Sequence, residues 1–478
     1  MAHVVEQLAR LSSGVPGLDS ILGGGFIEGA SYIIQGRPGA GKTILSNQIA
    51  FAQAASGRRI LYVTLLAETH DRLFQSLSTM TFFDRAMLGD AIKYVSVFQS
   101  LRDEGLGSVV KLIREETKRQ EATLLVFDGL LNARDRADTA LDVKTFVAEI
   151  QSQAAFVGCT VLLLTSTRDD DSCPEHTMVD GVLDVSDNIA GVRSYRQLQV
   201  RKSRGSASLG GLHLFEIGND GIVIFPRLEA FLGRPTIEDK VDPSHAPTGI
   251  EGLDDIVGGG LPAGSVTLLV GHPGSGKTSF GLSFLHHTPR NQRSLHFGFY
   301  ESTARLTAKS KALGMDVSER VPEQIDVIWN PLTENLLDKL AYQLLENIRR
   351  RQVKRLFIDG IGGFERASIS PARMVEFFAA LTNELRALGV TTIMTWELRE
   401  LSGGNALAPL PEISAMLDNL IEIQNVQSKK KLQRLISLLK FRDFPYVNRK
   451  YELLIRSGGL AIAELEDTAE PPSQAEKG

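Results

Sequence analysis

Cysteine is almost absent from this chain, which has two cysteines, Cys159 and Cys173, among 478 residues. A secreted domain held together by disulfides would use more of them, and a structural zinc site would need more ligands. We therefore expect both residues to be structural thiols in a reducing compartment.

Long hydrophobic runs are also lacking. No stretch reaches the roughly 18 to 20 uncharged apolar residues that a membrane span requires. The N-terminal MAHVVEQLAR has neither the basic region nor the apolar segment of a signal peptide. Hydrophobic residues make up 43% and charged residues 23%, as in folded globular proteins. We expect a cytoplasmic protein that does not enter a membrane.

Positive charge is not in excess, because the formal net charge is -5 at pH 7. This balance argues against broad attraction to nucleic acid or anionic lipid. Two basic runs, IRRRQVKR at 348–355 and KKK at 429–431, contain no interleaved aromatic residues. The first fits a solvated helix end, where the helix dipole favours cations. Nucleic acid is therefore not an expected partner.

A long segment occurs twice. GVPGLDSILGGGFIEGASYIIQGRPGAGKT begins at Gly14, and GIEGLDDIVGGGLPAGSVTLLVGHPGSGKT begins at Gly249. Lys42 corresponds to Lys277 without a gap. The two copies are too far apart for a solenoid repeat, so each should form a domain with its own core. The sequence predicts a duplicated domain.

The predicted boundaries follow from composition. Residues 1–228 and 248–463 form the two domains. Residues 229–247 form a linker, because three prolines and mixed charges replace any periodic apolar pattern there. Residues 464–478 are acidic, contain paired prolines and offer little to bury, which predicts a disordered tail.

Each copy alternates strand and helix patterns. SYIIQ, TLLVF and TVLLLT are short apolar strands, and KTILSNQIAFAQAAS has helical spacing that stops before Gly57. DVKTFVAEIQSQAAFV is an amphipathic helix between two such strands, and the second copy repeats the strands as RLFI and TTIMT. This pattern predicts an α/β fold, with a mainly parallel sheet flanked by helices and C-terminal antiparallel strands.

Both copies carry a phosphate-binding loop. GRPGAGKT at 36–43 and GHPGSGKT at 271–278 match G-x-x-x-x-G-K-[ST], and each follows a strand and opens a helix. Backbone N–H groups of such a loop surround the phosphates at a helix N-terminus, and the lysine reaches the β- and γ-phosphates. The predicted nucleotide-binding residues are Gly36, Gly39, Ala40, Gly41, Lys42, Thr43, Gly271, Gly274, Ser275, Gly276, Lys277 and Thr278.

The expected ligands are ATP and Mg²⁺. The hydroxyls of Thr43 and Thr278 should bind the metal ion. Asp128 in LLVFDG and Asp359 in RLFIDG each end a later strand and should hold the ion from the other side.

Hydrolysis also requires a group that orients or deprotonates water. Glu68 and Glu301 are the candidates, because both follow the strand after the P-loop helix. The alternative role for each is a solvated acid in the first turn of a helix. Trp396 and Glu397 end a strand where a polar group can sense the γ-phosphate, with core packing as the alternative for Trp396.

The opening pattern G-x-x-G-L-D-x-I-x-G-G-G, the P-loop after it and LQVRKSRGSASLGG resemble the KaiC family of RecA-like ATPases over roughly residues 10 to 463. The resemblance implies a double ring, usually hexameric. It also implies ATP sites completed by a Lys and an Arg of the neighbouring protomer, here Lys202 and Arg204. Lys440 and Arg442 match in the second domain, which lacks the glycine and serine that follow in KSRGS.

Two departures from the family pattern affect chemistry. The family has two adjacent glutamates after the strand that follows the P-loop, whereas Ala67 and Tyr300 replace the first of each pair. Only Glu68 and Glu301 remain as catalytic candidates, so we expect either slow hydrolysis or hydrolysis that relies on the remaining glutamate at altered geometry. The family's neighbouring Ser and Thr phosphorylation sites correspond here to Ser414 and Ala415, which leaves one acceptor for serine autokinase activity in the second domain.

Three functional hypotheses follow. The leading one is a ring-forming, ATP-hydrolysing regulator whose nucleotide state controls docking of a partner protein. The second is a DNA-associated motor related to RecA and DnaB. The third is an assembly scaffold that binds ATP with little turnover, which the residues Ala67 and Tyr300 favour.

Overall fold

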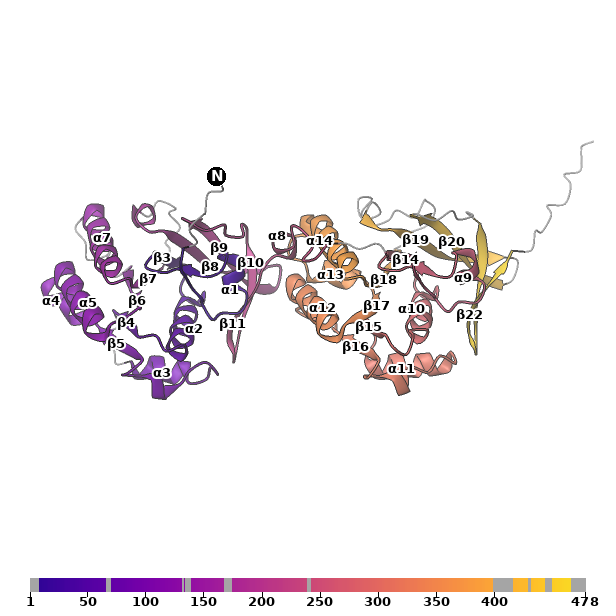
Figure 1. Cartoon of the computed structure of the whole chain (residues 1–478), viewed down its shortest axis with the longest axis horizontal. Coiled ribbons are helices and arrows are strands. Elements are labelled where there is room, and N and C mark those ends of the chain that lie inside the picture. Colours follow the sequence, from indigo (N-terminus) through magenta and orange to yellow (C-terminus); the bar gives the residue numbers. More distant parts are fainter. Residues whose placement is uncertain are drawn as a thin grey trace, which may run out of the picture. The chain divides into compact units, whose positions relative to one another are not determined.

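The computed structural model describes residues 8–65, 70–130, 133, 139–166, 174–238, 242–398, 416–428, 431–442 and 449–465. The chain divides into two compact units, Met1–Phe231 and Leu232–Gly478 (Figure 1). Each unit contains a large mixed sheet with helices packed on it, so the predicted fold class is confirmed.

The main sheet of the first unit has nine strands among its described residues, in the order β11-β10-β9-β8-β3-β7-β6-β4-β5. The part from β8 to β5 is parallel, and β8 to β11 are joined by antiparallel pairs. The strands are β3 (Ser31–Gln35), β4 (Ile60–Thr64), β5 (Ile92–Ser96), β6 (Leu124–Asp128), β7 (Thr160–Thr165), β8 (Gly181–Ala190), β9 (Arg193–Ser203), β10 (His213–Gly218) and β11 (Gly221–Phe225). A short ribbon pairs β1 (Arg10–Leu11) with β2 (Phe26–Ile27).

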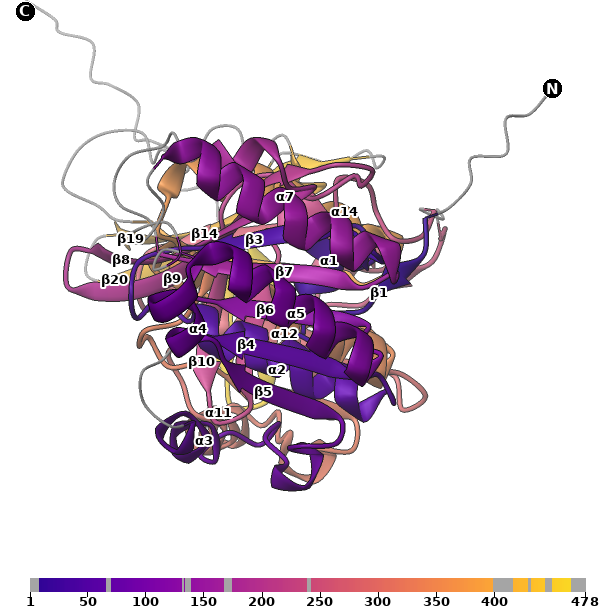
Figure 2. The same cartoon turned by 90° about the vertical axis from the view of Figure 1, so that its left-hand side faces the viewer.

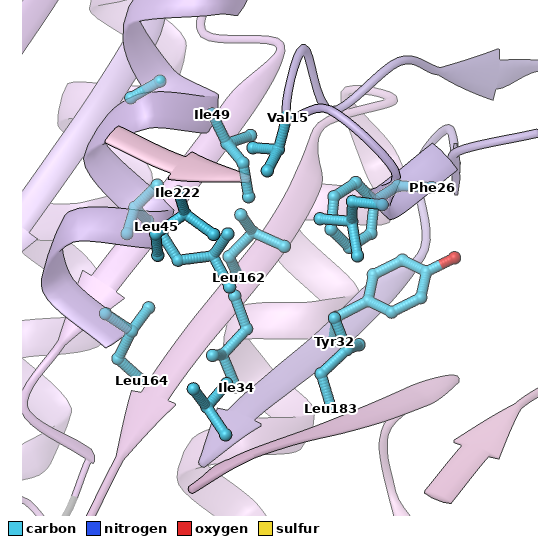
Figure 3. Packing of buried hydrophobic residues seen from close by; sticks show 14 of the residues in the cluster. Val15, Phe26, Tyr32, Ile34, Leu45, Ile49, Leu162, Leu164, Leu183 and Ile222 are labelled. Atoms are coloured by element: carbon cyan, nitrogen blue, oxygen red, sulfur yellow. The ribbon is translucent and has the colours of Figure 1, made fainter. Parts of the chain in front are cut away.

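Helices cover both faces of this sheet because its central strands are apolar on both sides. Ile34 of β3 and Leu162 of β7 belong to the core under α2 (Lys42–Ala55), where Figure 3 shows them facing Leu45 and Ile49. The alternate residue Ile33 belongs to the opposite core. That core lies under α4 (Phe98–Glu104), α5 (Leu106–Gln120) and α7 (Ala140–Phe156), the side seen in Figure 2. The shorter helices are α1 (Leu18–Ile21), α3 (Asp71–Leu77) and α8 (Leu228–Phe231).

The second unit repeats this arrangement in the order β16-β15-β17-β18-β14-β19-β20-β21-β22. Its strands are β14 (Val266–Gly271), β15 (Arg293–Gly298), β16 (Ile325–Trp329), β17 (Val353–Asp359), β18 (Thr391–Glu397), β19 (Asn419–Ser428), β20 (Lys431–Phe441), β21 (Lys450–Arg456) and β22 (Gly459–Glu464). Its helices are α9 (Leu253–Ile256), α10 (Lys277–His286), α11 (Thr303–Ala312), α12 (Leu337–Arg351), α13 (Gly362–Ala367) and α14 (Met374–Ala387).

The segment expected to be a linker contains regular structure at both ends. At its start, α8 runs to Phe231. Near its end, β12 (His245–Ala246) pairs with β13 (Leu261–Pro262). Between them, the backbone N–H and hydroxyl of Thr236 both donate hydrogen bonds to the buried carboxylate of Glu384. Isolated contacts of this kind have no periodic sequence pattern, so composition could not reveal them.

The basic run at 348–355 is a solvated face only in part, because Arg350 and Lys354 are exposed whereas Arg355 is buried. Arg349 pairs with the buried Glu384, and Arg351 forms two hydrogen bonds with Asp326. Arg355 is 2% exposed and lies over the ring of Phe284, at 5.0 Å from its centroid. Because α12 leads directly into the buried strand β17, side chains of the run turn inward and satisfy groups of the second unit.

Candidate nucleotide-binding sites

Each P-loop connects a buried strand to the helix that covers it. The first joins β3 to α2, and the second joins β14 to α10. Gly41 and Gly276 precede the helices with φ of 106° and 107°, a conformation that favours glycine. A Cβ on Gly36 would lie 1.9 Å from the carbonyl oxygen of Val185. The loops therefore need glycine at these positions to leave their N–H groups open toward a phosphate.

The P-loop lysines are held in the same way in both units. Lys42 Nζ donates to the carbonyl oxygens of Gly36 at 2.7 Å and Arg37 at 3.0 Å. Lys277 Nζ donates to the corresponding carbonyls of its own loop, both at 2.8 Å. Burial lowers the pKa of both ammonium groups. Each cation is thus fixed over the loop, where anionic phosphates would compensate its desolvation.

The predicted metal-binding pairs are adjacent in space. Thr43 Oγ1 donates to Asp128 Oδ2 at 3.1 Å, and Thr278 Oγ1 donates to Asp359 Oδ2 at 3.0 Å. Each threonine lies in the first turn of a helix, and each aspartate ends a strand of the parallel sheet. A hydroxyl and a carboxylate oxygen form the oxygen donor set that Mg²⁺ prefers, and the arrangement fits that ion.

Burial dominates the electrostatics of Asp128 in the first site and raises the pKa of its carboxyl group. The hydrogen bond from Thr43, the charge of Lys42 and a hydrogen bond from Tyr62 offset this only in part. The Tyr62 hydroxyl also lies 2.9 Å from Ser46 Oγ. A bound cation would favour the ionised carboxylate that this burial disfavours.

The carboxyl group of Asp359 in the second site has enough polar partners to offset its burial. Burial again acts to raise the pKa of the carboxyl, but the His296 imidazole and the hydrogen bonds from Thr278 and Thr395 outweigh it and the pKa is lowered. Thr395 Oγ1 donates to Oδ1 at 3.1 Å. His296 Nε2 lies 3.9 Å from Oδ2, which is beyond hydrogen-bonding distance, and a protonated imidazole at this distance would attract the carboxylate. His296 stands where the first unit has Tyr62, so the two sites differ electrostatically.

The second site opens into a cavity of about 500 Å³. Its lining includes Lys277, Thr278 and Asp359 together with Glu301 and Glu397. These groups come from four elements or loops that meet at the carboxyl ends of the parallel strands, where ligands bind in open α/β sheets. The cavity therefore brings the P-loop, the predicted metal-binding pair and a catalytic candidate together.

Glu301 immediately precedes Ser302, the N-cap of α11, and its carboxylate forms an ion pair with Lys309 of that helix at 2.5 Å. Beside it, the ring of Tyr300 packs so closely on Gly360 that a Cβ there would lie 2.3 Å from Cε2. Tyr300 thus occupies the space next to Asp359. Trp396 is 8% exposed, so it packs in the core while its surface also lines the cavity.

The predicted trans residues lie away from their own P-loops. Lys202 pairs across the sheet with Val182, which pairs with Ile33, three residues before Gly36. Its Nζ donates to the carbonyl oxygen of His176 at 2.8 Å. Lys202 is therefore level with the middle of β3, and Arg204, whose N–H donates to Asp180 O, lies near its start, whereas the phosphate loop follows the carboxyl end of the strand.

The second unit repeats this placement. Lys440 Nζ donates to Leu417 O at 2.8 Å, and Arg442 Nη1 lies 3.7 Å from Asp418 Oδ1. Burial and the nearby Arg442 lower the pKa of Lys440. Neither pair is brought to the P-loop of its own unit.

Several predicted residues fall outside the described part of the chain: Ala67, Glu68, Cys173, Ser414 and Ala415. Sequence reasoning missed His296, Lys309 and Thr395, because a histidine or threonine within a strand and a lysine in a helix carry no motif. Among the described residues, no group of three or more His, Cys, Asp or Glu could hold a metal ion. No helix in those residues has the length and apolar character to cross a membrane.

Comparison with known proteins agrees with this geometry. The family model for the ATPase KaiC matches residues 11–229 and 246–467. The chain is 23% identical to the circadian clock oscillator protein KaiC of Picosynechococcus sp. over 489 residues, covering 96% of this chain and 90% of the relative. The protein of the same name from Synechococcus elongatus is 24% identical, with 96% and 90% covered. The family model matches both repeats of this chain and covers most of its sequence, so the chain belongs to the KaiC ATPase family.

Proposed function

We propose that this protein binds ATP with Mg²⁺ in both domains and hydrolyses it as a homo-oligomeric ring, most simply a hexamer. The observation that carries the proposal is the duplicated site: in each unit the P-loop lysine is fixed over its loop and a threonine hydroxyl bonds to a strand-end aspartate. Two independent copies of one arrangement support a shared ligand.

Within each site, the chain's own residues would have distinct tasks. Backbone N–H groups of the loop and the lysine would bind the phosphates, and the Thr–Asp pairs would hold Mg²⁺, which supplies electrostatic stabilisation of the transferring phosphoryl group. Glu301 in the second site, and Glu68 in the first, would orient the attacking water. The side chain of Glu301 lines the same cavity as Lys277, which supports this role.

The basic pairs support a ring. Lys202 and Lys440 donate hydrogen bonds to the carbonyls of His176 and Leu417 and not to the P-loop of their own unit. A neighbouring protomer could place them at its γ-phosphate, where a cation supplied in trans can be worth about 10³- to 10⁵-fold in rate. Catalysis would then require assembly.

The output we propose is regulatory: nucleotide state would control docking of a partner protein in the cytoplasm, with Ser414 as the one acceptor for autophosphorylation in the second domain. A DNA motor is less well supported, because Arg349, Arg351 and Arg355 are used inside the second unit.

The test is steady-state ATP hydrolysis by the wild type, Lys42→Ala, Lys277→Ala and the double variant. Lys111→Ala is the control for a lysine substitution as such, because Lys111 is an exposed residue of α5 outside the loop. Light scattering reports ring size, and intact mass reports added phosphate. Each lysine variant should lose the turnover of its own site, and the double variant should lose all of it. ATP binding without turnover in the wild type would refute the ATPase proposal and favour the scaffold hypothesis.

A further inference from the structure

We propose that Lys309 is a positioning residue for Glu301 in the second site. Its ammonium group would hold one carboxylate oxygen, so that the other faces the space where water must stand to attack the γ-phosphate. This inference rests on the proposed ATPase function and names the residue that makes a single glutamate sufficient there.

The two carboxylate oxygens of Glu301 have different surroundings. Oε1 accepts the hydrogen bond from Lys309 Nζ. Oε2 is buried and has no hydrogen-bond partner among the described residues. Both side chains line the cavity that contains Lys277 and Asp359. Burying a carboxylate oxygen without a hydrogen-bond donor costs desolvation free energy. A water molecule in the cavity, such as one next to a bound phosphate, would donate a hydrogen bond and offset that cost.

The local structure explains how a lysine reaches this position. Lys309 follows Glu301 by eight residues and lies two turns into α11, whose side chains tilt toward the helix N-terminus. Its ammonium therefore extends back to the residue that precedes the helix. Helix stability does not require this direction, because Lys311 also lies in the last turn, where it interacts favourably with the dipole.

Charge in the cavity supplies the physical reason for the pair. Four carboxylates line this space and would repel one another: Glu301, Asp359, Glu365 and Glu397. Arg366 and Arg434 line it as well, and Lys277 bonds to its own loop and interacts electrostatically with Glu397 and Asp359. Lys309 is the cation that forms an ion pair with Glu301. Lys309 neutralises the repulsion at Glu301 and restricts its rotamers. Because the two side chains are 38% and 26% exposed, their pairing should add little to folding stability.

The first domain has no such lysine, since Ser76 follows Glu68 at the same spacing. The pair is therefore a feature of the second site, and its removal should leave the first site unaffected. Turnover of the second site is measured alone in a Lys42→Ala background. The variants are Lys309→Met, Lys309→Arg and Glu301→Gln, with Lys311→Met as the matched control on the same helix.

We expect Lys309→Met to lower kcat about tenfold while the KM for ATP stays within about twofold, because orientation rather than binding is lost. Lys309→Arg should restore most of the rate, and Lys311→Met should change nothing. Adding Lys309→Met to Glu301→Gln should cost no further activity, since both changes remove one function. A wild-type kcat in Lys309→Met, or full additivity in the double variant, would overturn the inference.

Calorimetry provides a readout that does not depend on turnover. Binding of ADP with aluminium fluoride, which mimics the transferring phosphoryl group, should weaken about tenfold in Lys309→Met, whereas binding of ADP alone should not change. If the Lys309→Met variant and the protein that retains Lys309 bind the mimic with equal affinity, the role of Lys309 is refuted. If Glu301→Gln retains turnover and mimic affinity, the catalytic role of Glu301 itself fails, which is a separate result from a silent Lys309 variant.

Discussion

The placement of Lys202 and Arg204 leads to a quantitative prediction about mixed rings. Lys202 lies two strands away from β3 across the sheet and is level with Ile33, which is three residues before Gly36. At about 3.3 Å per residue and 4.8 Å per strand, this is roughly 14 Å. The side chain is also tied to the carbonyl of His176. Lys202 should therefore serve only the site of a neighbour.

The experiment mixes two inactive proteins, both carrying Lys277→Ala so that only first-domain sites report. One also carries Lys42→Ala, and the other carries Lys202→Ala with Arg204→Ala. Each should lose at least about 10³-fold in hydrolysis when alone. In random rings assembled from equal amounts, about one interface in four joins an intact P-loop to an intact basic pair.

The mixture should regain about a quarter of the first-domain turnover of the Lys277→Ala protein, measured as steady-state phosphate release. Ring assembly of each variant, checked by light scattering, is the control. If the mixture stays as inactive as its components while forming rings, the basic pair does not act across the interface and the argument from sheet register is wrong.

Three further predictions test individual contacts. Gly36→Ala should lower first-domain turnover about 100-fold, because the new Cβ would collide with Val185 O and displace the loop; unchanged hydrolysis in a Lys277→Ala background would contradict this. Arg355→Met should destabilise the second domain by about 2 to 3 kcal/mol in urea unfolding, because the buried carbonyl of Phe284 and the carbonyl of Pro247 both lose a charged donor; an unchanged unfolding midpoint would count against it. Burial raises the pKa of Cys159 to about 12, so its thiol stays protonated at pH 8, and in a Cys173→Ser background it should react with a thiol reagent only after denaturation; rapid labelling of the native protein would show the thiol to be accessible.

Local pattern was enough to predict the α/β fold. The P-loop glycines, the apolar strands SYIIQ and TVLLLT and the helix that begins at Lys42 are encoded within short segments, and the structure has β3, β7 and α2 at these residues. The spatial neighbours Thr43 and Asp128 could also be anticipated, because parallel strands end at one edge of a sheet. Because the segment recurs, the same prediction applied to Thr278 and Asp359 in the second domain.

Contacts between segments without motifs were not predictable. The run at 348–355 reads as a basic surface, yet Arg355 is buried because its strand lies inside the sheet. The ion pair of Glu301 with Lys309, and the approach of His296 to Asp359, depend on how a loop folds back and which face of a strand a residue occupies. The sequence by itself determined which loops can bind phosphate, because a glycine-rich turn between a strand and a helix is a local property. Only the tertiary structure decided the charge environment of each site, because electrostatic interactions depend on distances between segments that are far apart in the chain.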